Sequence, residues 1–129
     1  MTIASKFLER INDQNKVSEK NSLILNEMAT VIDKSAGLGI EIRVFSEDHP
    51  PAHMHVLDTR TGSLIARVII PSKKPSNINS IRPYRNETLS NTQKSIILEA
   101  LNLRNNRTGT AFWKRAIEAW DLLHPDFPA

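Results

Sequence analysis

Three short segments near the middle of the chain carry the pattern of β-strands, and connections of only a few residues join them. Segment 40–45 (Ile-Glu-Ile-Arg-Val-Phe) alternates apolar and polar side chains and is rich in β-branched residues, as half-buried strands are. Segments 53–57 and 64–70 have a similar character, and the turn-forming stretch 58–62 joins them. Because connections this short cannot carry a parallel crossover, the sequence predicts an antiparallel meander, with room for a short fourth strand around Ile78–Arg82.

Two helices are predicted after the meander. Ser90 and Gln93 have the spacing of a capping box, and apolar residues follow at helical spacing over about 91–104. A second helix at 111–123 ends before His124, which we expect to serve the helix terminus. The chain is therefore predicted to be an α+β domain, with a three- to four-stranded antiparallel sheet packed by two C-terminal helices. The apolar face of the second helix consists of Phe112, Trp113, Ala116, Ile117, Trp120 and Leu123.

The first part of the chain has the pattern of a helix. Residues 2–35 contain neither glycine nor proline, and apolar side chains recur at helical spacing. Glycines at positions 37 and 39 then supply the left-handed conformations that commonly end a helix. We therefore expect two parts, a helical N-terminal extension at 1–36 and the α+β domain at 37–129. The apolar residues behind this prediction are Ile3, Phe7, Ile11, Leu25, Met28 and Ile32.

Composition excludes several classes of protein. A chain of 129 residues is long enough for one domain with one core. It has no cysteine, which leaves no disulfide framework, no thiolate nucleophile and no cysteine-based zinc site. Its sequence contains neither a signal-type apolar run at the start nor an apolar stretch long enough to span a bilayer. We expect a cytoplasmic protein with no membrane partner.

A histidine cluster is the strongest candidate for a functional site. Three of the four histidines, His49, His53 and His55, fall within seven residues, beside acids and a Pro-Pro pair. Residues two apart on a strand project from one face, so His53 and His55 are predicted to lie side by side. Pro50 confines His49 to extended geometry at the mouth of the hairpin. The predicted site is centred on His53 and His55, with His49 as a third group and Asp48 as the orienting acid.

Three kinds of chemistry are open to this cluster. His53 and His55 can bind a divalent metal ion, with a third ligand from His49, Asp48 or Asp58. Alternatively, the imidazoles can act as an acid–base pair on a phosphate ester. A third possibility is that they bind an anionic partner, or only line the solvent face of a strand. The residue types do not decide between these alternatives, so the question of enzymatic activity stays open.

Basic residues indicate which substrates suit the cluster. Arg43 and Arg67 lie on the segments before and after the histidines and are predicted to reach the same face. The formal net charge is only +3, but basic residues gather locally, and the stretch 100–117 holds four of them and no acid. Such clusters suit the phosphates of nucleic acid, although most surface charges are simply solvated. The second local group consists of Lys73, Lys74, Arg82 and Arg85.

The segment from Ile40 to Leu123, about two-thirds of the chain, resembles a family of small bacterial and phage proteins with a domain of unknown function. The family pattern is Ile-x-Val/Ile-Phe/Tyr, then an acid followed by His-Pro-Pro-x-His-x-His-Val, then Ala-Arg/Lys-Val. This chain has Ile-Arg-Val-Phe at 42–45, Asp-His-Pro-Pro-Ala-His-Met-His-Val at 48–56 and Ala-Arg-Val at 66–68. A tryptophan in the last helix, Trp120, is similar as well.

The resemblance implies the toxin of a toxin–antitoxin pair, with a small cognate antitoxin as its protein partner. Our first hypothesis is therefore a toxin-like effector that acts on nucleic acid, or on its machinery, through the histidine cluster. The second is a non-catalytic binding module, an inhibitor or adaptor, that holds a protein through the histidine face and the N-terminal helix. The N-terminal extension and the proline-containing loop at 71–85 depart from the family and are candidates for partner binding.

Overall fold

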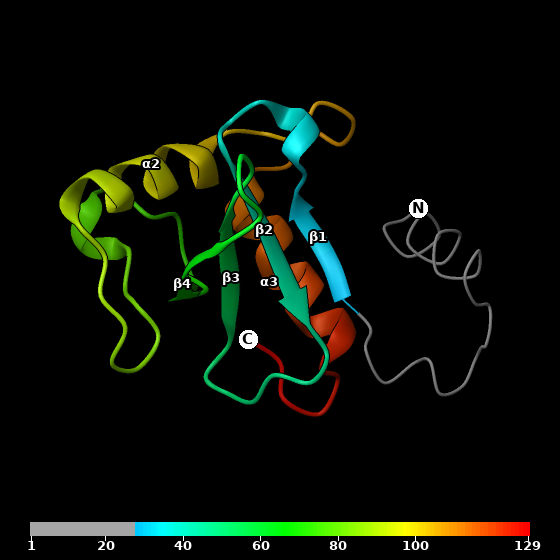
Figure 1. Cartoon of the computed structure of the whole chain (residues 1–129). Helices are drawn as coiled ribbons and strands as arrows, with labels where there is room; N and C mark the ends of the chain where they lie inside the picture. Colours follow the sequence, from blue (N-terminus) through cyan, green and yellow to red (C-terminus); the bar gives the residue numbers. More distant parts are fainter. Residues whose placement is uncertain (1–27) are drawn as a thin grey trace.

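The computed structural model describes residues 28–129 and shows an α+β fold (Figure 1). Its strands form one antiparallel sheet in the order β1-β2-β3-β4, which confirms the predicted class and meander. The elements are β1 (Met28–Ile32), η2 (Lys34–Ala36), β2 (Ile40–Phe45), β3 (His53–Asp58), β4 (Leu64–Ile69), η3 (Ile78–Ser80), α2 (Asn91–Asn102) and α3 (Phe112–Leu123).

The sheet register follows from the alternation of apolar and polar residues along each strand. Ile42 of β2 lies opposite Val56 of β3, so apolar side chains meet on one face. On the other face, Arg43 lies opposite His55, and His55 lies opposite Arg67 of β4. This register places one arginine on each side of His55.

The prediction of a helix over 2–35 is wrong for the part that the structure describes, because residues 28–32 form strand β1. Thr30, Val31 and Ile32 are β-branched, which favours a strand, and β1 pairs with the free edge of β2. The register shifts between Thr30 and Ile32, and this irregularity brings neighbouring apolar residues into the core. The spacing of four between Met28 and Ile32, which predicted a helix, therefore belongs to a strand with a bulge.

The rest of the predicted N-terminal helix, 2–27, lies outside the described residues. The fourth strand was also predicted in the wrong place. Residues 78–80 form the short helix η3, and that region of the chain joins the sheet through a single bridge between Val68 and Pro83. Prolines and asparagines there supply too few alternating apolar residues for a strand, whereas β1 supplies them.

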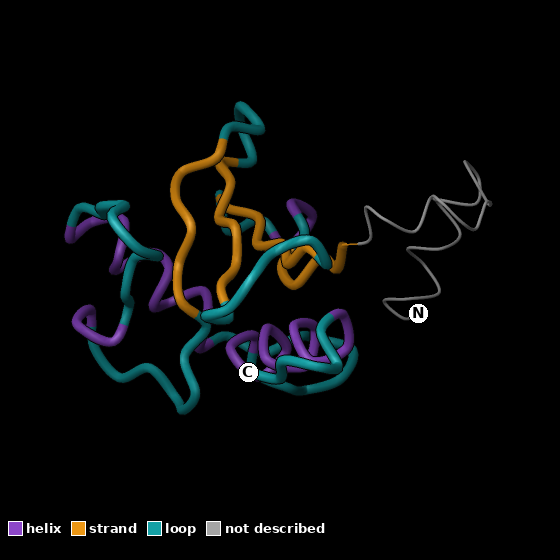
Figure 2. Tube along the Cα trace, turned by 90° about the horizontal axis from the view of Figure 1, so that it is seen from below, coloured by secondary structure: helices purple, strands orange, loops and turns teal. Residues whose placement is uncertain are grey.

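The two predicted C-terminal helices are confirmed to within two residues at each end. At the start of α2, Gln93 N donates to Ser90 Oγ over 3.1 Å and Ser90 N donates to Gln93 Oε1 over 2.9 Å, which completes the capping box. Helix α3 lies against one face of the sheet and contacts β1 and β2 (Figure 2). In the described part of the chain, both helices are too short to cross a membrane.

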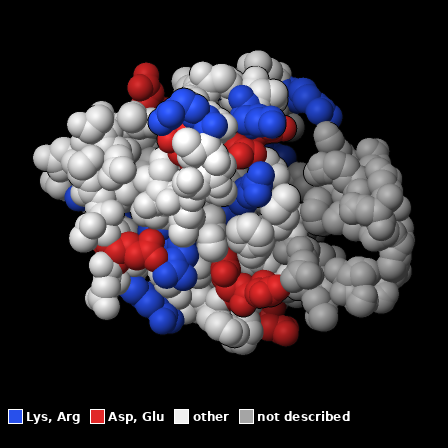
Figure 3. Space-filling model, viewed as in Figure 1, with Lys and Arg blue, Asp and Glu red and all other residues white. Residues whose placement is uncertain are grey.

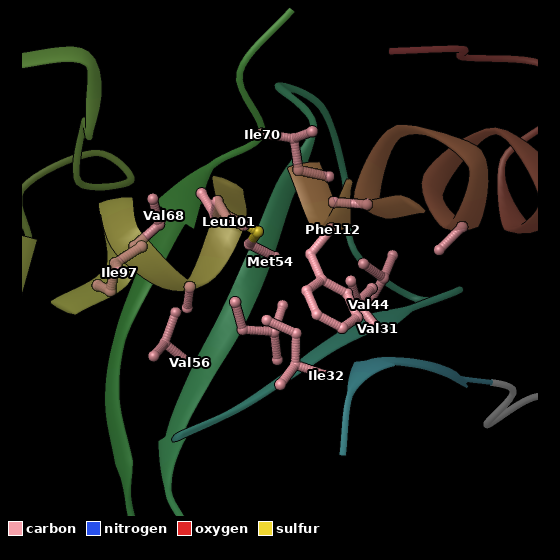
Figure 4. Packing of buried hydrophobic residues seen from close by; sticks show 14 of the residues in the cluster. Val31, Ile32, Val44, Met54, Val56, Val68, Ile70, Ile97, Leu101 and Phe112 are labelled. Carbon is pink, nitrogen blue, oxygen red and sulfur yellow. The ribbon is translucent and has the colours of Figure 1, made fainter. Parts of the chain in front are cut away.

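The hydrophobic core lies between this face of the sheet and the helices (Figure 4). Met54 and Val56 of β3 are fully buried there, in one cluster with Phe112 of α3. Complete burial of an aliphatic side chain stabilises a fold by about 1.5–3 kcal/mol. Because side chains alternate along a strand, the burial of Met54 and Val56 turns His53 and His55 toward the opposite face.

Candidate functional site

Three of the predicted site residues meet where β2 leads into β3. His53 is the first residue of β3, His55 follows two positions later, and Asp48 lies on the connecting loop. One ligand atom from each residue lies within 4.8 Å of the other two. Asp48 Oδ2 is 3.0 Å from His55 Nε2 and 3.4 Å from His53 Nε2. A single carboxylate oxygen therefore faces both imidazoles, and we call this group the Asp–His–His cluster.

His53 is held rigidly within the fold. It is only 1% exposed, and its ring stacks on Tyr84 with 3.8 Å between ring centroids. Its Nδ1 lies 2.9 Å from the carbonyl oxygen of Pro51, a position in which only a protonated Nδ1 donates a hydrogen bond. In the neutral ring this fixes the tautomer and leaves a lone pair on Nε2.

That lone pair has no hydrogen-bond partner within residues 28–129, although the Nε2 atom is buried. The nearest charged atom is Asp48 Oδ2 at 3.4 Å, which in the ionised carboxylate is also an acceptor. Asp48 Oδ2 already shares a hydrogen bond with His55 Nε2 over 3.0 Å, so His53 Nε2 is the atom left without a partner. A buried nitrogen that faces an acceptor is costly unless a proton or a cation lies between them.

Burial lowers the pKa of His53 below its usual 6.5. The hydrogen bond to Pro51 and the negative charge of Asp48 raise the pKa in part, and the charges of His55 and Arg67 lower it again. The net effect is a lowered pKa, so His53 is neutral at neutral pH. A neutral imidazole is the form that accepts a proton or binds a metal.

Asp48 is positioned by the far end of the chain. His124, just after α3, has its Nδ1 3.0 Å from the Trp120 carbonyl oxygen and its Nε2 3.1 Å from the Asp48 carbonyl oxygen. The first contact serves the helix terminus, as expected from the sequence, whereas the second joins the helix end to the site loop. Both views show the C-terminal end beside this loop (Figures 1 and 2). The ring donates to both carbonyls only when both nitrogens carry protons.

His55 is the accessible member of the cluster, with 20% of its side chain exposed. Arg43 and Arg67 flank it across the sheet, and their side chains are 31% and 38% exposed. Acids hold both guanidinium groups, since Arg43 pairs with Glu41 over 3.1 Å and Arg67 forms an ion pair and two hydrogen bonds with Glu87. The arginines are therefore fixed beside His55.

Charges of both signs lie side by side on the face drawn in Figure 3. Burial alone would raise the pKa of Glu87, but the hydrogen bonds and the positive charge from Arg67 outweigh it, and the pKa is lowered. The positive charges of Arg43 and Arg67 are thus partly neutralised by Glu41 and Glu87. Arg43 keeps a buried Nε without a hydrogen-bond partner among the described residues, so not all of its donors are used by Glu41.

Other predicted site residues contribute no ligand atom to the cluster. His49 is exposed and takes no part in it, and Asp58 lies at the opposite end of β3, paired with Ile40. Arg85 lies over the Tyr84 ring, with 4.9 Å from its guanidinium carbon to the ring centroid. The remaining basic residues are exposed and make no ion pair within the described part: Lys73, Lys74 and Arg82.

Sequence reasoning missed Tyr84 and Glu87 as parts of the site. Both lie in an irregular segment without periodicity, so no local signal indicates their contacts. The backbone brings them into place, since Tyr84 N donates to the Arg67 carbonyl oxygen over 2.9 Å beside β4. The only usable signal was that Tyr84 is the single tyrosine of the chain. It follows a proline and has a basic residue close on each side, in the stretch Arg-Pro-Tyr-Arg at 82–85.

Comparison of the chain with protein-family models, with curated proteins and with solved structures finds no match. The site itself must therefore support any functional proposal. Its chemistry allows three residues to hold a divalent metal, and allows the exposed imidazole to exchange a proton with a bound molecule. The arginines add hydrogen-bond donors for an anion.

Proposed function

We propose that this protein is a toxin-like effector that acts on nucleic acid, or on a protein that handles it, through the Asp–His–His cluster. One observation carries the proposal. Arg43, His55 and Arg67 form a cross-strand row on the face of the sheet opposite the core, and its middle residue, His55, belongs to the cluster. Two guanidinium groups beside a reactive imidazole are suited to a phosphodiester.

The spacing of the row supports this substrate class. Directly opposed residues on antiparallel strands have Cβ atoms about 4.5–5.5 Å apart, so one phosphate group can contact His55 and a neighbouring arginine together. An arginine fork binds two phosphate oxygens, and a guanidinium held by an acid needs little reorganisation to do so. Glu41 and Glu87 thus act as positioning residues for Arg43 and Arg67.

Charge outside the row is also consistent with a long anionic substrate. Lys73 and Lys74 are exposed on the loop after β4, and Arg107 is exposed between α2 and α3. Contacts of this kind add affinity for the nucleic-acid backbone without sequence preference. Since the net charge is only +3, we expect the affinity to fall with salt but to depend mainly on the row.

The test is controlled expression in a bacterial host. The intact protein should slow growth, and His55→Ala or Asp48→Asn should relieve the effect, because each removes one group of the cluster. The matched control is His49→Ala, which changes an exposed histidine of the same loop and should remain as toxic as the intact protein. Circular dichroism of each purified variant shows whether the fold is retained.

Two outcomes would overturn the proposal. One is growth that is unaffected by the intact protein, and the other is toxicity that persists in His55→Ala and Asp48→Asn. If the protein instead recovers one stoichiometric protein partner whose binding is independent of the cluster, the non-catalytic binding module replaces the effector as the better hypothesis.

A further inference from the structure

We propose that the Asp–His–His cluster binds one divalent transition-metal ion of the zinc type through Nε2 of His53, Nε2 of His55 and Oδ2 of Asp48. As an account of how the effector works, this inference rests on the proposed function, because it names the cofactor of the same site. The binding of the ion is a separate property and can be measured without any assay of growth.

The unpartnered nitrogen of His53 is the first argument. Its Nε2 is buried without a hydrogen-bond partner in the described part of the chain, and it points toward Asp48 Oδ2 at 3.4 Å. His55 Nε2 lies 3.0 Å from the same oxygen. His55 Nε2 shares a hydrogen bond with that oxygen, and in the tautomer of His55 that carries its proton on Nδ1 all three atoms present lone pairs to one place. A cation that takes the place of this hydrogen bond satisfies all three atoms, His53 Nε2 included.

Distances within the cluster suit such an ion. Zinc lies about 2.0–2.2 Å from nitrogen and oxygen ligands, so neighbouring ligand atoms in a tetrahedral site are about 3.4 Å apart. The two distances to Asp48 Oδ2 are 3.0 and 3.4 Å, and the largest separation in the cluster is within 4.8 Å.

Residues around the ligands hold them as metal ligands are usually held. The Pro51 carbonyl accepts a hydrogen bond from His53 Nδ1, which keeps Nε2 free for the ion. His124 binds the carbonyl of Asp48 and so fixes the loop that carries the carboxylate. Tyr84 covers the His53 ring and excludes water from one side of the cluster.

The ligand set decides the class of metal. Two imidazole nitrogens and one carboxylate oxygen suit borderline transition metals, whereas Ca²⁺ and Mg²⁺ prefer sites made of oxygen. Three protein ligands also leave a coordination position open, as in catalytic zinc sites. An ion held by these residues would lie near His55, which the two arginines flank, so it would suit an anionic oxygen of a substrate.

The experiment uses untagged full-length protein, stripped with a chelator and titrated at neutral pH with Zn²⁺ in a calorimeter. We expect one equivalent of Zn²⁺ to bind and no measurable binding of Ca²⁺ or Mg²⁺. Titration with Co²⁺ should give visible absorption bands of the intensity typical of four or five ligands. The absence of both Zn²⁺ and Co²⁺ binding would overturn the inference in favour of a proton shared by His53 and Asp48.

Variants assign the ion to the cluster. His55→Ala and Asp48→Asn should weaken Zn²⁺ binding by more than about tenfold, since even outer-shell changes cost that much. His49→Ala should bind as the intact protein does. His53 is left unchanged because it is buried against Tyr84 and its loss would disturb the fold. Binding of one equivalent of Zn²⁺ to His55→Ala with the affinity of the intact protein would place the ion elsewhere and refute the inference.

The two proposals fail in different ways. Metal binding together with unaffected growth would remove the effector function and leave the metal site standing. Slowed growth that depends on His55, in a protein that binds neither Zn²⁺ nor Co²⁺, would leave the effector standing and remove the metal.

Discussion

His53 shows how far one residue can be constrained by its neighbours. Its position on β3 turns the side chain away from Met54, its Nδ1 binds Pro51, and its ring lies on Tyr84. The alternation of the strand was visible in the sequence, so the pairing of His53 with His55 could be predicted. Its burial could not be predicted, because Tyr84 lies in an irregular segment 31 positions after His53.

A pH dependence of stability follows from the lowered pKa of His53. In the metal-free protein, with a chelator present, the unfolded chain takes up a proton as the pH falls below the usual 6.5, while the folded protein does not. Stability is therefore fully present above this pH and is lost as the pH falls toward the lower pKa of the folded state. Urea unfolding from about pH 8 to about pH 5 should show the midpoint falling over this range.

The matched control for this prediction is His49→Ala, which changes an exposed histidine of the same loop and leaves His53 in place. Glu87, whose pKa is lowered from 4.5, adds its own loss of stability only at more acidic pH. A midpoint that stays constant between neutrality and pH 5, or rises as acid is added, would contradict the burial of a neutral His53.

At the scale of elements, the sequence predicted a helix or strand correctly where two independent local signals agreed. Strands β2, β3 and β4 showed alternation together with turn residues, and α2 showed a capping box together with an apolar face. Segment 28–32 had only an apolar spacing of four, which fits a helix and a bulged strand equally well. The open edge of β2 decided between them, and an edge is a property of the assembled sheet.

The capping box of α2 gives a prediction at this scale. Ser90→Ala removes the oxygen that accepts from Gln93 N, and it should lower the free energy of unfolding by about 1 kcal/mol. Ser95→Ala is the matched control, since Ser95 is exposed inside the same helix and should change stability by less than about 0.5 kcal/mol. Equal effects of the two changes in urea unfolding would show that the cap contributes nothing.

In the whole molecule, Arg43, His55 and Arg67 lie on the face of the sheet away from the core, whereas His53 reaches the core at Trp120, with 5.8 Å between the ring centroids. Residues from separate elements meet at the cluster. His124 lies 76 positions after Asp48, yet one hydrogen bond joins them. No periodicity or spacing in the sequence indicates such a contact, which explains why His124 was assigned only to the helix terminus. Long-range contacts of this kind position Asp48, and they arise only from the complete fold.

This contact predicts an effect at a distance. His124→Ala removes the hydrogen bonds to Trp120 and Asp48 and should lower the free energy of unfolding by about 2 kcal/mol. Because the loop is released, Zn²⁺ binding should weaken as well, although His124 is not a ligand. His124→Gln, which can keep one donor, should restore part of both properties. Calorimetry that finds unchanged Zn²⁺ affinity in a folded His124→Ala protein would show that the loop needs no anchor.

The same contact has a consequence for the order in which the protein is made. A ribosome delivers Asp48, His53 and His55 early, but the histidine that anchors their loop emerges 76 residues after the first of them. A nascent chain thus carries the Asp–His–His cluster before it carries the histidine that anchors the loop. If the finished protein harms its host, the harm is delayed during synthesis. The loop of the Asp–His–His cluster is anchored only when α3 and His124 have left the ribosome.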